Sequence, residues 1–373
     1  MKRLLQFLEL TKKSFVSDNY QRLHLVLGNE SCDLDSTVSP MALAYLFSKN
    51  SLLGVPKDAL VLPVFNIPYE NFPTKTENNF LLNKFNIKTE WLVFRDQIKF
   101  EDILARKNVT VSLVDHHILS KTDEILHDSV IHVFDHRPVD PDMNWDSKKV
   151  MVKIEEVGSC ASLISDIILK NDQQILCYEL AYLLYATIVY DTVGLKPENG
   201  RMKELDLNIA KKLEDLFKFD KDRDSTFAEV RQAHIDVSHL TVRQLLLRDL
   251  KIVCDIPVPG LPMLVEDFLK IDGAYDEVTK FSREYSGGVV VLIGLDTRGE
   301  VKRDIAILWM QDCRLKEVLI EKLKKAQELK GYDFEFTPVK TCFNNVICLR
   351  QGNVKLSRKQ IIPFVKETIV ELK

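Results

Sequence analysis

The sequence contains no pair of cysteines at CxxC spacing, and its seven cysteines are an odd number spread along 373 residues. This usage argues against a disulfide framework and is typical of reduced thiols in an intracellular protein. We therefore expect a cytoplasmic protein.

Long apolar runs are also missing. No uninterrupted apolar stretch approaches the roughly 18 residues that a membrane-spanning helix needs. The N-terminal segment "MKRLLQFLELTKKSF" is broken by Gln6 and Glu9, a pattern typical of an amphipathic helix rather than a signal peptide. We expect no membrane partner.

An excess of positive charge is absent too. The formal net charge is −4, so we expect no nucleic-acid partner, and any site for anions must be built from local charges. Hydrophobic residues make up 46% and charged residues 28%, which is ordinary for a globular protein. The length is enough for about two domains.

The first half of the chain alternates short apolar segments with helical patterns. Strands are expected at 22–28, 60–65, 91–94, 109–114 and 130–134. Helices are expected at 39–49, 77–85, 159–170 and 174–190. This alternation predicts an α/β domain with a mostly parallel sheet and helices on both faces.

The second half has a different texture, because its strands follow one another along the chain. Strands are expected at about 251–258, 288–295, 303–309, 333–338 and 342–350. Helices are expected at 227–249, 274–285, 313–329 and 358–371. We expect a smaller α+β domain with a mixed sheet, and we place the domains at 1–207 and 223–373, with a charged, turn-prone linker at 208–222.

Ionisable residues follow several apolar segments of the first half. Each one alone has an ordinary interpretation as a turn residue or helix N-cap. However, ligands of an open parallel sheet lie at the carboxyl ends of its strands, and carboxylates gathered there repel one another unless cations compensate them. Such oxygen-rich sites with one or two histidines suit Mg²⁺ or Mn²⁺, and two ions can clamp a phosphoryl group. The residues are Asp33, Asp35, Asp115, Asp135, His136 and Asp191.

Five segments in this order and spacing resemble the DHH phosphoesterase superfamily: "GNESCDLDS", "LVDHHILSK", "FDHRP", "VGSCASL" and "IVYDT". The resemblance is strongest to its exopolyphosphatase branch. The segments "DVSHLTVRQLLLRDLK" and "LSRKQIIPF" resemble the accessory DHHA2 domain of that branch. The likeness covers nearly the whole chain.

The resemblance implies a ligand set for two divalent cations, with Mg²⁺ favoured and Mn²⁺ as the alternative: Asn29, Asp33, Asp35, Asp115, His136 and Asp191. Asp115 would bridge both cations, whereas Asn29 and Asp33 would bind only one of them. The remaining three would complete the other site.

The literal "DHH" at 115–117 is not the motif that names the superfamily, which corresponds to "DHR" at 135–137. His116 and His117 either orient Asp115 or face the substrate, and His116 is a candidate for catalysis beside Asp115 and Arg137.

Two positions depart from the related family II pyrophosphatases, which the resemblance implies have histidine at both. Asn29 offers an amide oxygen in place of an imidazole, which should shift the preference toward Mg²⁺. Arg137 cannot act as an acid or base near neutral pH, but it can hold a phosphate through two parallel hydrogen bonds.

Basic residues elsewhere are candidates for substrate binding. Arg358 and Lys359 stand at the expected start of a helix, where cations are otherwise disfavoured. Lys75 falls near a position where relatives often have arginine, although an exposed loop lysine is its ordinary interpretation. The segment "GSCAS" at 158–162 either packs helices closely or turns its backbone N–H groups toward an anion.

Together these features predict a two-domain hydrolase of phosphoanhydrides with its site in the cleft between the domains. It would act as a short-chain exopolyphosphatase, with nucleoside tetraphosphates as further substrates, using water activated by two cations. A cyclic-nucleotide phosphodiesterase is the alternative within enzymes. A regulatory protein that binds nucleoside diphosphate kinase is the alternative of another class.

Overall fold

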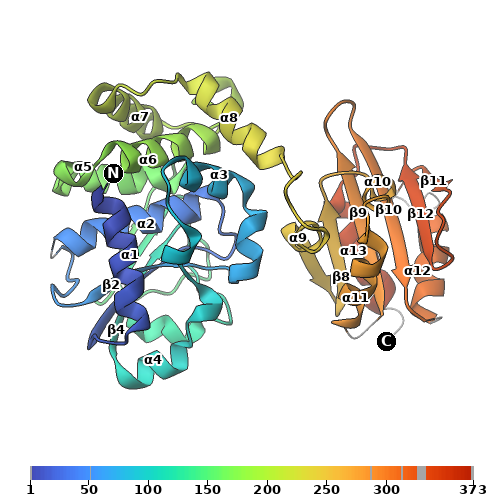
Figure 1. Ribbon diagram of the computed structural model, residues 1–373, viewed down its shortest axis with the longest axis horizontal. Coiled ribbons are helices and arrows are strands. Elements are labelled where there is room, and N and C mark those ends of the chain that lie inside the picture. The colour runs from blue at the N-terminus through green and yellow to red at the C-terminus, as the bar shows by residue number, and fades with distance from the viewer. Residues whose placement is uncertain (1, 51, 286–287, 312–313, 326–332, 371–373) are drawn as a thin grey trace. The chain divides into compact units, whose positions relative to one another are not determined.

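The computed structural model describes residues 2–50, 52–285, 288–311, 314–325 and 333–370. The chain divides into two compact units, Met1–Ile235 and Asp236–Lys373 (Figure 1).

The first unit is built on a six-stranded sheet in the order β3-β2-β1-β4-β5-β6, and every neighbouring pair is parallel. The strands are β1 (Arg22–Leu27), β2 (Leu60–Phe65), β3 (Val93–Phe94), β4 (Asn108–Val114), β5 (Val130–Asp135) and β6 (Met151–Ile154). The predicted parallel sheet is therefore confirmed. β6 was not expected, because "MVKI" is short and only partly buried at the sheet edge.

Helices cover both faces of this sheet, as predicted (Figure 1). They are α1 (Lys2–Val16), α2 (Leu34–Lys49), α3 (Thr76–Lys84), α4 (Phe100–Arg106), α5 (Cys160–Asn171), α6 (Tyr178–Asp191), α7 (Glu204–Phe217) and α8 (Arg223–Ile235). Side chains of β1 alternate between the faces: Val26 packs with α1, α2, α5 and α6, whereas Leu25 packs on the side covered by α4. The core thus has two layers, one on each face of the sheet, and the strand ends are held between them.

The boundary between the units lies later than the linker expected at 208–222. Residues 208–217 continue α7, whose Ile209, Ala210 and Leu213 are buried in the first unit. The single helix expected at 227–249 is wrong, because α8 ends at Ile235 and α9 (Val242–Arg248) begins anew. Asp236 accepts a hydrogen bond from the backbone of Ser238 (3.0 Å), and Thr241 caps α9 by accepting from Gln244 (3.2 Å). These local side-chain acceptors favour a turn and a new helix start.

The second unit contains a mixed sheet in the order β11-β12-β10-β9-β8-β7, in which only β8 and β9 pair in parallel. The strands are β7 (Leu250–Val253), β8 (Ile256–Leu261), β9 (Val289–Asp296), β10 (Lys302–Trp309), β11 (Phe336–Val339) and β12 (Val346–Gln351). The helices are α9, α10 (Val265–Phe268), α11 (Ala274–Arg283), α12 (Arg314–Lys325) and α13 (Arg358–Val370). The predicted α+β domain is confirmed, although the strand expected at 251–258 is a hairpin of two. Residues 313, 326–329 and 371 of the expected helices lie outside the described residues.

None of the helices in the described part of the chain combines the length and the apolar character that a membrane span requires.

Candidate metal centre

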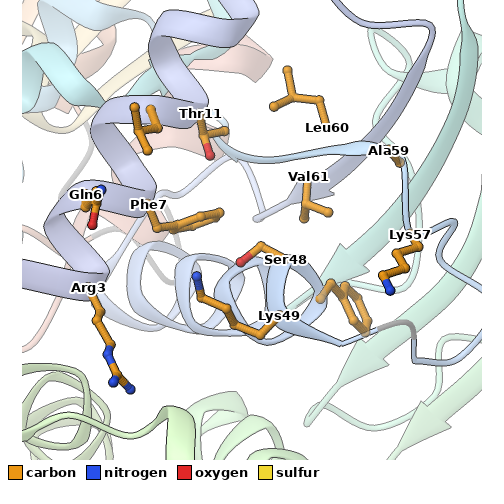
Figure 2. Close-up of a pocket in the computed structure, with 12 residues that line it drawn as sticks. Arg3, Gln6, Phe7, Thr11, Ser48, Lys49, Lys57, Ala59, Leu60 and Val61 are labelled. Carbon is orange, nitrogen blue, oxygen red and sulfur yellow. The ribbon is translucent and has the colours of Figure 1, made fainter.

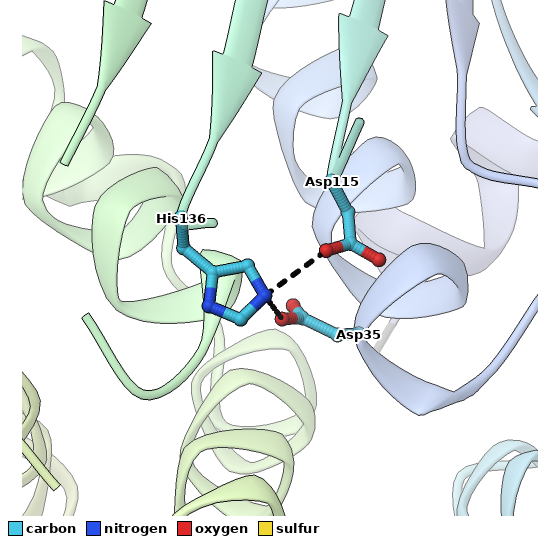
Figure 3. A group of neighbouring side chains, drawn as sticks. All are labelled: Asp35, Asp115 and His136. Atoms are coloured by element: carbon cyan, nitrogen blue, oxygen red, sulfur yellow. Dashed lines mark ion pairs between the residues drawn. The ribbon is translucent and has the colours of Figure 1, made fainter. Parts of the chain in front are cut away.

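Three side chains from different elements meet at the carboxyl end of the parallel sheet (Figure 3). Asp35 lies in the first turn of α2, Asp115 follows β4, and His136 follows β5. One ligand atom from each lies within 4.8 Å of the others. Nε2 of His136 is 3.2 Å from Oδ1 of Asp115 and 3.9 Å from Oδ2 of Asp35.

The hydrogen bond on the far side of His136 determines what its Nε2 atom can do. Nδ1 lies 2.9 Å from the carbonyl oxygen of Val157, so Nδ1 must carry a hydrogen. Nε2 therefore directs either a proton or a lone pair toward two carboxylates. Burial lowers the pKa of His136, but the hydrogen bond to Asp115 and the charge of Asp35 outweigh it and raise that pKa to about 10. The two carboxylates stabilise a positive charge beside Nε2 of His136. A proton on Nε2 supplies this charge when no metal ion does.

Asp115 is held in one orientation by donors on its other oxygen. Oδ2 accepts from Nδ2 of Asn29 (2.8 Å) and from the Ser36 hydroxyl. The backbone at Asp115 has φ +65°, in the left-handed region that aspartate and asparagine tolerate better than most residues. Burial and the neighbouring Asp35 carboxylate raise the pKa of Asp115 to about 7. A bound cation would lower this pKa again.

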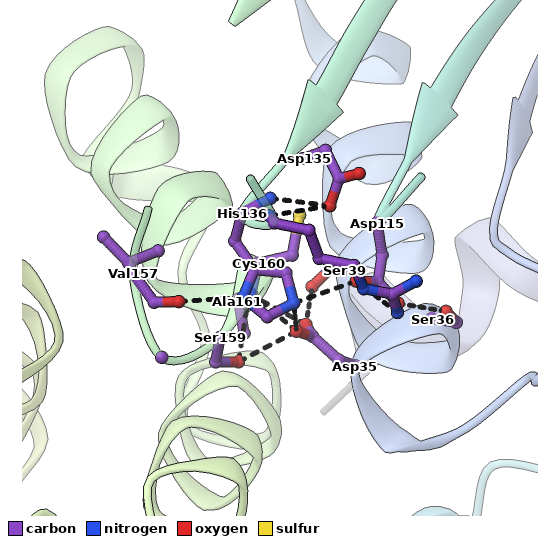
Figure 4. A network of polar contacts seen from close by, with 12 residues as sticks. Asp35, Ser36, Ser39, Asp115, Asp135, His136, Val157, Ser159, Cys160 and Ala161 are labelled. Atoms are coloured by element: carbon purple, nitrogen blue, oxygen red, sulfur yellow. Dashed lines mark hydrogen bonds and ion pairs between the residues drawn. The ribbon is translucent and has the colours of Figure 1, made fainter. Parts of the chain in front are cut away.

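Asp35 is oriented by the N-terminus of α5 (Figure 4). Oδ2 accepts from the backbone N–H of Cys160 (2.5 Å) and the hydroxyl of Ser159 (3.1 Å), and Oδ1 accepts from the N–H of Ala161 (2.8 Å). Burial raises the pKa of Asp35, while the charge of His136 and the hydrogen bonds from Ser39 and Cys160 oppose the rise. The segment 158–162 thus combines both expected properties, because its N–H groups do face an anion, and that anion is the Asp35 carboxylate.

Asp191 is the last residue of α6, and the negative charge of its carboxylate is the least compensated of the group. Within the described residues, Oδ2 of Asp191 is buried and has no hydrogen-bond partner. Burial and the charges of Asp35 and Asp33 raise the pKa of Asp191 well above its ordinary value, while Ser159 opposes them. A buried carboxylate oxygen without a donor indicates a place for a cation.

Asp33 and Asn29 lie beside this group in different roles. Asp33 is the N-cap of α2 and accepts from the N–H of Ser36 (3.0 Å), as the ordinary interpretation of an aspartate after a strand predicts. Oδ1 of Asn29 accepts from the N–H of Ser31 (2.7 Å), which leaves its Nδ2 facing Asp115. A backbone N–H can only donate, so this amide orientation is fixed. Asn29 therefore offers its nitrogen, not the expected oxygen, toward the centre.

The two histidines of the literal "DHH" differ from each other. Nδ1 of His117 bonds to Asp135, and its Nε2 accepts from the N–H of Asp140 (2.9 Å), so both ring nitrogens are occupied. Nδ1 of His116 bonds to the carbonyl of Val114 (3.0 Å), and burial lowers its pKa. His117 thus supports Asp135, whose other oxygen accepts from the N–H of His136 (2.7 Å).

The residues present fit divalent cations. Asp35, Asp115 and Asp191 supply carboxylate oxygens, and His136 supplies one imidazole whose other nitrogen is fixed by a carbonyl. Carboxylates with one imidazole suit Mg²⁺ or Mn²⁺.

The expected substrate-binding cations have different surroundings. Nη2 of Arg137 lies 3.5 Å from Oδ1 of Asp115, and this side chain is 48% exposed. Lys75 is partly buried between a 3₁₀ turn (Tyr69–Thr74) and α3. In the second unit, Arg358 forms an ion pair with Asp249 and is only 15% exposed, whereas Lys359 is exposed. Arg358 thus has an acidic partner within its own unit, and its role in binding substrate stays a prediction.

A pocket of about 370 Å³ lies at the amino ends of the strands, away from the candidate metal centre, between α1, the end of α2 and the start of β2 (Figure 2). Arg3, Lys49 and Lys57 are among its lining residues. None of the expected site residues lines it.

Sequence reasoning missed residues that hold the centre without belonging to its motifs. Ser36 donates to Asp115, and Asp206 of α7 accepts from the segment 158–162. A local signal for Asp206 exists, because it accepts from the N–H of Lys203 (2.8 Å) in the pattern of a capping box. Its link to Gly158 spans 48 residues and has no sequence signal.

Comparison with known proteins agrees with this architecture. The DHHA2 domain model matches residues 228–368. Human exopolyphosphatase PRUNE1 is 33% identical over 353 residues, covering 93% of this chain and 76% of that protein. Mouse protein prune homolog 2 is 26% identical over 98% of this chain, but only 11% of that protein is covered.

A Methanococcus jannaschii crystal structure assigned to the family II inorganic pyrophosphatases covers 93% of this chain with 20% identity and a TM-score of 0.48. That score supports no conclusion by itself. The identity and coverage shared with PRUNE1 suffice: the chain belongs to the prune family of DHH phosphoesterases, a family of enzymes, and its second unit is a DHHA2 domain.

Proposed function

We propose that this chain is a metal-dependent phosphoanhydride hydrolase that acts as an exopolyphosphatase on short inorganic polyphosphates, with nucleoside tetraphosphates as further substrates. The observation that carries the proposal is the cluster of Asp35, Asp115 and His136, in which an imidazole nitrogen faces two buried carboxylates. The exopolyphosphatase named PRUNE1 is similar over 93% of this chain, which supports the same reaction class here.

Two divalent cations, when bound, supply Lewis acidity that activates water and draws charge from phosphoryl oxygens. One cation would be held by Asp35, His136 and Asp191, and the other by Asp33, with Asp115 shared between them. Asn29 would act on Asp115 rather than on a cation, because its Nδ2 donates to that carboxylate at 2.8 Å. The remaining carboxylate and imidazole donors suit Mg²⁺ and Mn²⁺ alike.

Arg137 is the side chain best suited to hold a substrate phosphate. Its guanidinium contacts Asp115 through one nitrogen and is half exposed, so its other donors can reach a second anion. A planar guanidinium binds phosphate through parallel hydrogen bonds. Lys75 and Lys359 would add positive charge for longer phosphate chains, whereas Arg358 would first have to leave Asp249.

The test is phosphate release from tripolyphosphate, long-chain polyphosphate, pyrophosphate and adenosine tetraphosphate, and formation of AMP from cyclic AMP, each with Mg²⁺ and with Mn²⁺. We expect the highest kcat/KM on tripolyphosphate or the tetraphosphate and none without a cation. The Asp115→Asn protein is the control for contaminating phosphatases. Faster turnover of cyclic AMP would support a phosphodiesterase instead. No release from any substrate, together with binding to nucleoside diphosphate kinase, would support the regulatory alternative.

A further inference from the structure

One segment of the first unit contacts three of the candidate metal ligands, His136, Asp35 and Asp191. The carbonyl of Val157 fixes the ring of His136, and the side chain of Ser159 and the N–H groups of Cys160 and Ala161 fix the carboxylate of Asp35 (Figure 4). We call residues 157–162, which include the first turn of α5, the ligand-holding loop. A shift of this loop would move the imidazole and the carboxylate together.

A buried carboxylate from α7 holds this loop from behind. Oδ2 of Asp206 accepts from the N–H of Gly158 (2.8 Å) and the N–H of Lys203 (2.8 Å). Oδ1 accepts from the hydroxyl of Ser162 (2.6 Å). The Asp206 side chain is fully buried, so water cannot replace these bonds without a rearrangement.

Steric contacts around Gly158 restrict the loop further. A Cβ atom at this position would lie 2.5 Å from Cγ2 of Thr192, 2.8 Å from the carbonyl oxygen of Arg201 and 2.9 Å from Oδ2 of Asp206. Thr192 directly follows the candidate ligand Asp191, and the hydrogen bond from Ser159 of the same loop opposes the rise in the pKa of the Asp191 carboxyl. The loop is therefore wedged between the end of α6 and the start of α7.

We propose that Asp206 is a positioning residue that sets the divalent-cation affinity of the centre by locking the ligand-holding loop. The proposal rests on the proposed metal-dependent function. Asp206 does not belong to the Asp35–Asp115–His136 cluster and acts through the loop on His136, Asp35 and Asp191. Loss of hydrogen bonds that orient metal ligands typically lowers metal affinity by about 10- to 100-fold.

The competing interpretation is that Asp206 only caps α7 and joins it to α5. In that case its removal lowers the stability of the fold but leaves the affinity for metal unchanged in the folded protein. The two interpretations therefore differ in metal binding, measured without substrate.

The experiment compares four variants of the full chain with wild type by calorimetric titration with Mn²⁺ after chelator treatment, alongside urea unfolding. Asp206→Ala removes all three acceptor contacts, and Asp206→Ser leaves a hydroxyl too short to span to Gly158. Asp206→Asn is the conservative variant, because its oxygen can accept from both N–H groups while its NH₂ donates to Ser162, whose hydroxyl can turn to accept.

Asp304→Ala in the second unit is the matched control. Asp304 is a buried carboxylate that accepts from the backbone N–H groups of Val265 (2.8 Å) and Glu266 (3.2 Å), and it lies outside the metal-binding unit. Its removal should lower stability through the same kind of lost contact without changing Mn²⁺ affinity.

We expect Asp206→Ala and Asp206→Ser to bind Mn²⁺ about 10- to 100-fold more weakly, and Asp206→Asn to bind within a few-fold of wild type. In the metal-free protein, the ring ¹⁵N shifts of His136 should change in Asp206→Ala and not in Asp206→Asn, because they report the hydrogen bond to Val157.

Wild-type affinity in a folded Asp206→Ala or Asp206→Ser protein overturns the proposal. Failure of both to fold, or equal weakening by the Asp304 control, assigns Asp206 a structural role and overturns it as well. A wild-type protein that binds Mn²⁺ but hydrolyses no polyphosphate overturns only the proposed substrate. A wild-type protein that binds no divalent cation overturns the metal centre and this proposal together.

Discussion

Replacing Asp115 by asparagine should abolish hydrolysis and, at the same time, stabilise the metal-free protein. Asparagine keeps the shape of the side chain and tolerates the left-handed backbone at this position, where φ is +65°. Alanine is the poorer test, because a non-glycine residue without a polar side chain is disfavoured there by about 1–2 kcal/mol. In the variant, the amide oxygen can accept from Asn29 and Ser36 while the NH₂ group donates to Nε2 of His136.

The size of the stabilisation follows from the pKa of Asp115. Burial and the Asp35 charge raise this pKa from 3.8 to about 7, which corresponds to about 4 kcal/mol against the ionised native state. Because the pKa is raised on folding, this cost is absent below about pH 4, grows with pH and is complete above about pH 7. This pKa already includes the favourable contacts of the ionised carboxylate with His136 and Arg137, so we expect a gain of up to about 4 kcal/mol at pH 8 and less at pH 5.

The assay is urea unfolding of both proteins in chelator at pH 5 and pH 8, with Mg²⁺ titration and tripolyphosphate hydrolysis at pH 8. Asp123→Asn is the matched control, since Asp123 is equally buried but paired with Arg95 at 2.8 Å, so its neutralisation should destabilise the protein. An Asp115→Asn protein that is less stable than wild type at pH 8 would refute the argument from charge repulsion. Retention of more than about a tenth of the activity would refute the role of Asp115 as the shared ligand.

Three further outcomes are expected. Lys359→Ala should raise KM for tripolyphosphate with little change in kcat, whereas Arg358→Ala should mainly lower the unfolding free energy by about 1–3 kcal/mol; the reverse pattern would return Arg358 to the substrate site. Arg137→His should lower kcat/KM about ten- to a hundredfold on tripolyphosphate and less on pyrophosphate, and it should introduce a pH dependence between about 6 and 7.5. Equal losses on both substrates with an unchanged pH profile would show that Arg137 has a structural role. Burial, with a smaller effect of His132, lowers the pKa of His24 to about 3. The free energy of unfolding should therefore fall by about 1.4 kcal/mol per pH unit as the pH drops below about 6.5. In urea unfolding, His24→Gln should flatten this slope, whereas His127→Gln, at an exposed position, should not.

The fold class could be predicted because its signals are local. Short apolar runs such as "LHLVL" and "VTVSLV" alternate with helical patterns, and this periodicity alone predicts a parallel sheet covered by helices. The same local reasoning failed at 236–241, where Asp236 and Thr241 interrupt an apolar pattern that otherwise continues as one helix. Hydrogen bonds from the backbone to such short polar side chains compete with the helix, and hydrophobic periodicity shows them only weakly.

Chain order is enough to predict which residues reach the carboxyl edge of the sheet, since Asp35, Asp115 and His136 each come directly after a strand or in the next turn. How these residues are used depends on contacts between distant segments. The Ser31 N–H turns the nitrogen of Asn29 toward Asp115, and Asp249 holds Arg358. Gly158 meets Asp206 across 48 residues of chain. Hydrogen bonds and ion pairs depend on directions and distances over a few ångströms, which side-chain order along the chain does not specify and which packing alone fixes.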